Sequence, residues 1–235
     1  MLYRDRGVVV RTHKLGEADR IIVLISEEHG KVRAVAKGVR KTKSKFGSRL
    51  EPPTHASLQM YEGRQLDTIT QVETVDHFRA IREDLDRLTR AVSMLEAADQ
   101  LSLEREPNAD LYRMLVGALR ALDDRNGPLV VAGFYWKMLA LEGFRPVVEQ
   151  CVHCGSSASL VSFDPSEGGV LCSEHRRGTR LSGDAIGLLQ DILCGRLASA
   201  LEVPASSATH EVDQLATRVM EHHIERRLRS VGLLE

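Results

Sequence analysis

The spacing of apolar residues changes once along this chain, near Phe78, and this change limits the folds that the chain can adopt. Before Phe78, apolar and polar residues alternate with a period of two, as they do in half-buried strands. After it, apolar residues recur three and four apart, as on one face of a helix. A strand-rich first third followed by a helical remainder predicts an α+β protein of several domains and argues against a βαβ sheet.

Five short strands are predicted before this change of period. Turn signals separate them, among them Glu27–Gly30 and Tyr61–Arg64. The apolar positions that define the strands are Val8 to Val10, Ile21 to Ile25, Val32 with Ala34 and Ala36, Ala56 with Leu58 and Met60, and Leu66 with Ile69, Val72 and Val75. Five strands in about 75 residues fit a small antiparallel barrel, because closure removes the edges that an open sheet would expose.

Helices are predicted over the remainder of the chain. The first face has apolar residues three and four apart from Phe78 to Leu95, and we expect it to form one helix. Later faces are Leu111 to Leu122, Val131 to Leu141 after Gly127-Pro128, Ile186 to Leu193 with Ser182 as its N-cap, and Val212 to His222, beginning near Ser206 or Ser207. A set of helices this long can bury a core of its own.

Three of the four cysteines lie in a cluster with metal-ligand spacing. Cys151 and Cys154 form one pair, and Cys172 and His175 form a second pair seventeen residues later. Two such pairs let four ligands converge on one Zn²⁺ ion, which predicts a single structural zinc. His153 competes as the fourth ligand, although its place between two ligating cysteines directs its ring away. The alternative is three buried thiols and a surface histidine.

We call the segment that contains these two pairs the zinc knuckle. A closed four-ligand site leaves no position for a catalytic water, so the predicted zinc has a structural role and not a catalytic one. The chain has no H-E-x-x-H motif and no zinc-deaminase arrangement before its cysteines. It has no G-x-x-x-x-G-K-[ST] motif for nucleotide phosphates and no G-x-S-x-G motif for a nucleophile. Cys194 stands apart on a helical face and is interpreted as a core thiol.

A basic stretch lies in the predicted connection between the third and fourth strands. Eight cations occur between Lys31 and Arg49 with no acidic residue among them. Acid-free runs this dense are typical of phosphate-binding surfaces, although a solvated loop is the alternative. Phe46 is expected to be exposed and available for base stacking. The candidate DNA-binding residues are Lys31, Arg33, Lys37, Arg40, Lys41, Lys43, Lys45, Phe46 and Arg49. Arg226, Arg227 and Arg229 are the next candidates.

Charge and composition agree with this division of the chain. Residues 1–80 carry 15 Lys and Arg against 10 Asp and Glu, whereas residues 81–235 carry 17 against 23. A basic end suggests a nucleic-acid surface, but charge cannot separate DNA from RNA. No apolar run approaches the length of a membrane span, and the N-terminus lacks the apolar core of a secretory signal. We therefore expect a cytoplasmic protein without a membrane partner.

Taken together in this order, several short segments make the chain resemble the RecO family. They are Gly7 to Val10, Gly16 to Arg20, Gly30-Lys31, Ala36 to Arg40, Leu50-Glu51-Pro52, Tyr61-Glu62-Gly63, and Leu139 to Pro146 leading into Cys151 to Gly155. The resemblance runs along most of the chain. One departure is His175, which stands where a cysteine would be expected as the fourth ligand; histidine binds zinc as well.

The resemblance implies an OB-fold barrel over residues 1–79 and a helical domain over residues 80–235, with the zinc knuckle at 147–180. It further implies binding of single- and double-stranded DNA, annealing of complementary strands, and no enzymatic activity. The implied partners are RecR and the C-terminal tail of single-strand DNA-binding protein, with loading of RecA as the consequence. The expected location is the cytoplasm, in association with the nucleoid.

Two other functions share some of these features. An OB-fold RNA-binding protein would also have a barrel and a basic loop, and it would differ in preferring RNA. A zinc-dependent nucleic-acid enzyme would need an open metal position and a nearby general base. The sequence does not identify the residues that contact RecR or the partner tail, and it does not fix the oligomeric state.

Overall fold

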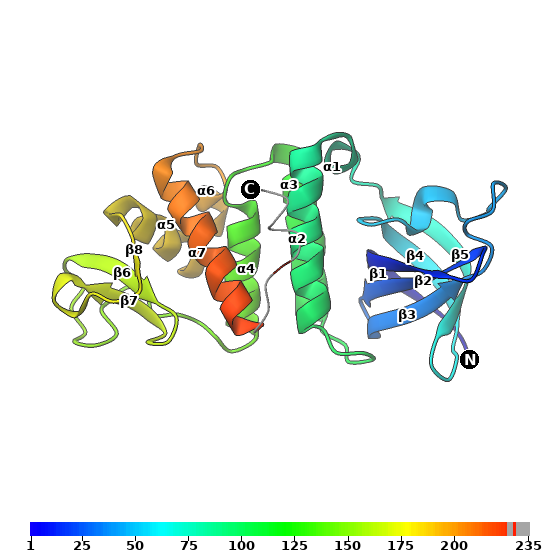
Figure 1. Ribbon diagram of the computed structural model, residues 1–235, viewed down its shortest axis with the longest axis horizontal. Coiled ribbons are helices and arrows are strands. Elements are labelled where there is room, and N and C mark those ends of the chain that lie inside the picture. Colours follow the sequence, from blue (N-terminus) through cyan, green and yellow to red (C-terminus); the bar gives the residue numbers. More distant parts are fainter. Residues whose placement is uncertain (225–227, 229–235) are drawn as a thin grey trace. The chain divides into compact units, whose positions relative to one another are not determined.

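A computed structural model describes residues 1–224 and residue 228, and its chain is drawn in Figure 1. Two compact units can be distinguished, Met1–Asp124 and Arg125–Leu228, and each is described by itself. Arg226, Arg227 and Arg229, the reserve candidates for DNA binding, lie outside the described residues. None of the described helices is both long enough and apolar enough to cross a membrane.

The first unit begins with a closed barrel of five strands, which confirms the predicted barrel. Its strands are β1 (Leu2–Leu15), β2 (Asp19–Ser26), β3 (Gly30–Ala36), β4 (His55–Tyr61) and β5 (Asp67–Asp76). They follow one another around the barrel as β1-β2-β3-β5-β4. All pairs are antiparallel except β3 with β5, where Ala34 pairs with Asp67 and Val35 with Thr68. This is the five-stranded arrangement of an OB-fold.

Inward-facing side chains fill the barrel. The buried cluster comprises Val9, Ile22, Leu24, Val32, Ala34, Ala36, Phe46, Leu50, Ala56, Leu58, Met60, Ile69 and Val72. Most of these occupy alternate positions of their strands, as the period of two predicts. Two members, Phe46 and Leu50, come instead from the long connection between β3 and β4, where a short 3₁₀ helix, η1 (Gly47–Leu50), turns the chain back toward the barrel.

Three helices complete the first unit: α1 (Arg79–Glu83), α2 (Leu85–Leu101) and α3 (Ala109–Arg125). The prediction of one continuous helix from Phe78 to Leu95 is wrong. Asp84 is extended and its side chain accepts a hydrogen bond from the Arg87 amide, so a new helix begins there. Because a new helix begins at this cap, residues before and after it no longer share one face. Leu85 and Val92, which were expected to be buried, are 80% and 37% exposed.

The helices are tied to the barrel by polar contacts. Arg105, between α2 and α3, donates to the buried carboxylate of Asp67 at 2.6 Å, and its amide donates to the carbonyl of Lys31 at 3.0 Å. At Gly30, a Cβ atom would lie 2.0 Å from the carbonyl oxygen of Glu106, so a side chain has no room there. The barrel and α1–α3 therefore pack as one compact unit.

The second unit is built around α4 (Val130–Leu141), which is buried on nearly all sides. Beside it lie α5 (Gly183–Leu193), α6 (Leu197–Ala200) and α7 (Ser207–His223). The predicted N-cap of α5 is confirmed, because the Ser182 hydroxyl accepts from the Ala185 amide at 3.2 Å. Ser206 caps α7 in a capping box with Thr209. Between α4 and α5 the chain forms a small sheet of β6 (Leu160–Asp164), β7 (Gly169–Cys172) and β8 (Thr179–Arg180).

Candidate metal centre and nucleic-acid interface

The four predicted ligands of the knuckle come together beside the small sheet. Cys151 and Cys154 lie in the turn that precedes β6, Cys172 is the last residue of β7, and His175 ends the 3₁₀ helix η2 (Ser173–His175). The first turn closes on itself, since the Gly155 amide donates to the Cys151 carbonyl at 2.8 Å with Gly155 at φ 74°. Glycine adopts this positive φ without steric cost.

The ligand atoms of the four side chains all lie within 4.8 Å of one another. The Sγ atoms of Cys154 and Cys172 are 3.9 Å apart, and Nδ1 of His175 is 3.3 Å from Sγ of Cys172 and 4.0 Å from that of Cys151. Around a tetrahedral zinc ion, two sulfurs would be about 3.8 Å apart, and a sulfur and a nitrogen about 3.5 Å apart. The donor set and its spacing therefore fit a tetrahedral metal ion.

The electrostatics of the cluster lower the pKa of two of its three thiols, Cys151 and Cys172, and raise that of Cys154. Burial raises the pKa of the Cys151 thiol, but backbone hydrogen bonds, chiefly that of Cys172, outweigh burial and lower this pKa to about 6. The hydrogen bond with His175 lowers the pKa of the Cys172 thiol, and the same contact raises the pKa of His175. Since a metal binds thiolates and not thiols, lowered thiol pKa values make both sulfurs better ligands near neutral pH.

Two side chains near the cluster are not part of it. His153 is exposed, and its ring stacks on that of His175 with centroids 4.7 Å apart, outside the group of four. Cys194 follows α5 as its C-cap residue and is also outside the group. Within the described residues, the four side chains that converge are thus the four named by the cysteine and histidine spacing.

The basic connection between β3 and β4 is tethered at both ends. At its start, the Gly38 amide donates to Asp19 at 2.7 Å and the Arg40 amide donates to the Ala18 carbonyl at 2.9 Å. At its far end, Phe46 and Leu50 insert into the barrel core. The cations of this segment, which we call the basic loop, are Lys37, Arg40, Lys41, Lys43, Lys45 and Arg49.

All six cations of the basic loop are exposed, and none takes part in an ion pair in the part of the chain that the structure describes. Three of them bond only to backbone carbonyls: Arg40 to Gly16, Lys45 to Thr70 and Arg49 to Lys45. A carbonyl does not cancel a full positive charge, so the loop presents a concentrated positive surface to solvent.

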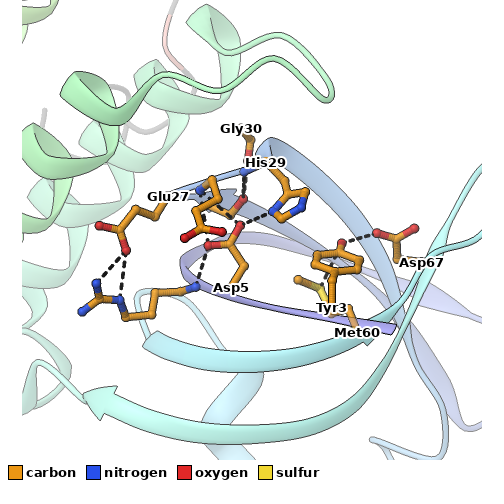
Figure 2. A network of polar contacts seen from close by, with 10 residues as sticks. Tyr3, Asp5, Glu27, His29, Gly30, Met60 and Asp67 are labelled. Carbon is orange, nitrogen blue, oxygen red and sulfur yellow. Dashed lines mark hydrogen bonds and ion pairs between the residues drawn. The ribbon is translucent and has the colours of Figure 1, made fainter. Parts of the chain in front are cut away.

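Several carboxylates of the barrel have partners of their own. Nδ1 of His29 lies 2.7 Å from Oδ2 of Asp5. Figure 2 shows this contact and the hydroxyl of Tyr3 directed at Asp67. Glu27, also labelled there, pairs with Arg6, with Oε2 of Glu27 2.9 Å from Nη2 of Arg6. Outside this network, Glu51 pairs with Arg20. Glu73 of β5, by contrast, lines the same open space as Lys45 and Arg49, so it lies against the cations of the basic loop.

Lys31 and Arg33 differ from the other predicted DNA-binding cations. Lys31 donates to the backbone carbonyl of Asp99 at 2.7 Å and to its carboxylate at 3.3 Å, and Arg33 pairs with Glu104 at 3.4 Å. The Asp99 carboxylate, 5% exposed, is shared with Arg11. These two cations of β3 connect the barrel to α2 and the segment after it.

The expectation that Phe46 is exposed is wrong. Its side chain is 2% exposed and belongs to the barrel core, with Lys45 Nζ 5.0 Å from the ring centroid. The reason is that the basic loop has two apolar residues, and burying them closes the loop onto the barrel. A base cannot stack on a ring that is already covered, so Phe46 is withdrawn as a contact residue.

Sequence reasoning missed a hollow beside the basic loop. Lys45 and Arg49 face β5 across an open space of about 510 Å³ that is lined by Phe46, Thr70, Gln71, Val72 and Glu73. Alternation along β5 marks which side chains point outward, but nothing local in the sequence places the loop over them.

Barrel and cluster together define a class, the OB-fold proteins with a cluster of cysteines and a histidine that could hold a metal ion in a helical region. Two family descriptions match the chain: Recombination protein O N terminal over residues 1–78, and Recombination protein O C terminal over residues 82–231. The chain therefore belongs to the RecO family, whose members act in DNA repair and recombination.

Similar proteins agree over the whole length. The chain is 43% identical to DNA repair protein RecO of Nocardioides sp. across 244 aligned residues that cover 100% of both chains. It is 43% identical to that of Frankia casuarinae, covering 100% of this chain and 98% of the relative. The corresponding protein of Cutibacterium acnes is 42% identical, with 99% and 98% covered.

Proposed function

We propose that this chain binds single- and double-stranded DNA through the basic loop and anneals complementary strands. The observation that supports the proposal most directly is the set of six exposed cations without an ion pair among the described residues. Phosphates would displace the counterions of such a surface and gain free energy from their release. Annealing needs no covalent step, because cations reduce the repulsion between strands and base pairing supplies the driving energy.

The chain is proposed to act without catalysis, as a mediator. Its further roles would be to help load RecA onto DNA covered by single-strand DNA-binding protein, with RecR and the C-terminal tail of that protein as partners. Family membership is what supports these partners. A location in the cytoplasm at the nucleoid follows from the same proposal. The division into a barrel domain, residues 1–79, and a helical domain, residues 80–235, remains a prediction.

The knuckle is proposed to hold one structural Zn²⁺ through Cys151, Cys154, Cys172 and His175. Three sulfurs and one imidazole nitrogen form a donor set that zinc prefers, and four protein ligands leave no open position for water. The chain's contribution is to bring two turns of the second unit together at this point. The ion would fix the turn before β6 against the end of β7.

The proposal is tested by measuring the salt dependence of binding to a single-stranded oligonucleotide. If about five phosphates are neutralised, log affinity should fall with log salt at a slope of about −3.5. Replacing Arg40, Lys41 and Lys43 by alanine should reduce the steepness of this slope by about 2. The control replaces Arg79 and Arg113, which are exposed but ion-paired with Glu83 and Asp110.

The control variant should keep the wild-type slope. An unchanged slope in the triple variant, with normal folding, would place the DNA surface elsewhere. Annealing of two complementary oligonucleotides without ATP, and with both strands left intact, tests the non-enzymatic part. Tighter binding of RNA than of DNA of equal length would instead favour an RNA-binding protein.

A further inference from the structure

The outward face of β1, β4 and β5 is continuous with the hollow beside the basic loop. Cross-strand pairs place Leu2 of β1 opposite Tyr61 of β4, and Tyr61 opposite Thr68 of β5. Gln59 lies between Arg4 and Gln71 in the same way. Alternate residues of β1 and β4 point to the same side of their strands. The register shift between β4 and β5 at Gln59 and Met60 keeps both Thr68 and Gln71 on that side, with Ile69 and Val72 buried on the other, so these side chains share the outer surface of the barrel.

Tyr61 is the aromatic residue that this surface exposes. It is 57% exposed, and every other Phe, Tyr and Trp side chain among the described residues is buried or partly covered. Its hydroxyl group has no hydrogen-bond partner within the described residues. Leu2, across the strand pair, is 52% exposed and extends the apolar surface beside the ring.

Cations surround this surface. Arg4 and Arg64, the latter in the turn after β4, are both exposed. Neither forms an ion pair in the portion of the chain described. Lys45 reaches β5 directly, donating to the Thr70 carbonyl at 3.0 Å. Glu62, next to Tyr61, is 3.8 Å from the N-terminal amine, which partly compensates its charge. Glu73 is the acid that lines the hollow.

The distances suit a nucleic acid strand. Tyr61 is two residues beyond Gln59 on β4, which is about 7 Å, and β5 lies about 5 Å to the side. The ring and the hollow at Gln71 are thus separated by about 9 Å, a span that a few nucleotides cover, and OB-folds bind about 4 to 16 nucleotides.

We propose that single-stranded DNA crosses the outer face of β1, β4 and β5, with phosphates at Lys45, Arg49 and Arg4 and a base stacked on Tyr61. This inference rests on the proposed DNA binding and adds the path and the stacking residue. It makes a distinction that the basic loop alone does not make: unpaired bases can stack on the ring, whereas the bases of a duplex are already stacked on one another.

The experiment compares Tyr61→Ala and Tyr61→Phe with the wild-type chain on three probes of equal length. The probes are oligo-dT, an abasic strand with the same phosphates, and a duplex. Tyr61→Ala should weaken oligo-dT binding by about 5- to 150-fold with an unchanged salt slope. Binding of the abasic strand and of the duplex should not change. Tyr61→Phe should bind oligo-dT like the wild type, because the ring is retained.

Two further variants separate this inference from general charge effects. Val75→Ala removes an exposed apolar side chain at another position of β5, 46% exposed, and should leave all three affinities unchanged. Glu73→Gln should tighten binding of both the oligo-dT and abasic strands, since it removes a negative charge from the hollow. Wild-type affinity of a folded Tyr61→Ala variant for oligo-dT would overturn the inference while the proposed DNA binding stands. Failure of the wild-type chain to bind any probe would instead overturn the proposed function itself.

Discussion

The metal knuckle and the basic loop both gather side chains of one kind, but they do so in opposite senses. In the knuckle, four donor atoms turn inward until they lie within 4.8 Å of one another. In the basic loop, six cations turn outward, while the apolar Phe46 and Leu50 turn inward and hold the segment to the barrel. The proposed partner of the convergent donors is a metal ion, and that of the divergent cations is a polyanion.

This difference implies that the two regions are stabilised by different interactions. The zinc proposed for the knuckle would hold its two turns together, so metal binding and folding should fail together there. The basic loop depends on buried apolar side chains for its structure, so its cations can be changed without unfolding it. The following predictions test whether the two regions are independent in this way.

The largest effect is expected from breaking the knuckle. Cys151→Ser should remove most of the bound zinc and lower the free energy of unfolding by about 5 kcal/mol or more, a share of the 10–16 kcal/mol that structural zinc gives to small peptides. Metal analysis and thermal unfolding measure this, with Cys194→Ser as the control outside the cluster. Less than half an equivalent of zinc in freshly purified, fully folded wild-type protein would contradict it.

A smaller loss is expected when the anchor of the basic loop is removed. Phe46→Ala should cost about 3–5 kcal/mol of unfolding free energy, because it leaves a cavity in the barrel core. Denaturant unfolding of this variant is compared with that of Lys43→Ala, which should be as stable as the wild type. If stability were unchanged and only DNA affinity fell, the ring would be exposed in solution after all.

Acid should weaken the barrel through Asp67. Burial raises the pKa of this carboxyl, but hydrogen bonds from Tyr3, the Gly63 amide and Arg105 outweigh burial and lower it overall. Because the pKa is lower in the folded state, the stabilisation is complete above the unfolded pKa of about 3.9 and is lost as pH falls through the folded pKa.

Asp67→Asn should therefore cost about 2 kcal/mol at neutral pH and flatten the acid limb of the stability curve. Unfolding by urea at pH 7 and at successively lower pH values measures both effects. An acid limb as steep as that of the wild type would show that other carboxyls carry it.

The finest comparison is between two lysines of the same basic stretch. Lys31→Ala should lower the free energy of unfolding by about 1–2 kcal/mol, because it removes a partner from the buried Asp99 carboxylate while Arg11 remains. Lys41→Ala should leave stability unchanged and reduce the steepness of the single-strand salt slope by about 0.7. If the salt slope changed equally in both variants, ion pairing within the protein would not distinguish the cations that bind DNA from those that do not.

Local patterns predicted most of what was found. The strands follow from a period of two, and the four ligands follow from two pairs of residues with fixed short spacing, so neighbours in sequence become neighbours in space. The N-cap of α5 at Ser182 was predictable for the same reason. In each case the residues that decide the structure lie within one turn or one knuckle.

What the sequence could not show has a different cause. Lys31 is paired with a residue 68 positions away and Arg33 with one 71 positions away, so no window around the basic stretch could show these contacts. Phe46 was expected at the surface because its neighbours are charged, whereas the barrel floor that covers it comes from β5 and the other strands. The prediction of one helix after Phe78 was wrong because of a single residue, Asp84. Its side chain caps the start of α2, which divides the predicted helix in two.

Contacts between the barrel and α2–α3 bear on how such proteins can be recombined with one another. The two family descriptions meet between residues 78 and 82, inside the first compact unit. A chimera joined at that point would pair one parent's Gly30, Lys31 and Asp67 with the other parent's Asp99, Arg105 and Glu106. Exchanges joined near residue 125 would keep these contacts within one parent. The segments that can be exchanged between relatives without loss of contacts therefore need not be the segments that the two family descriptions match.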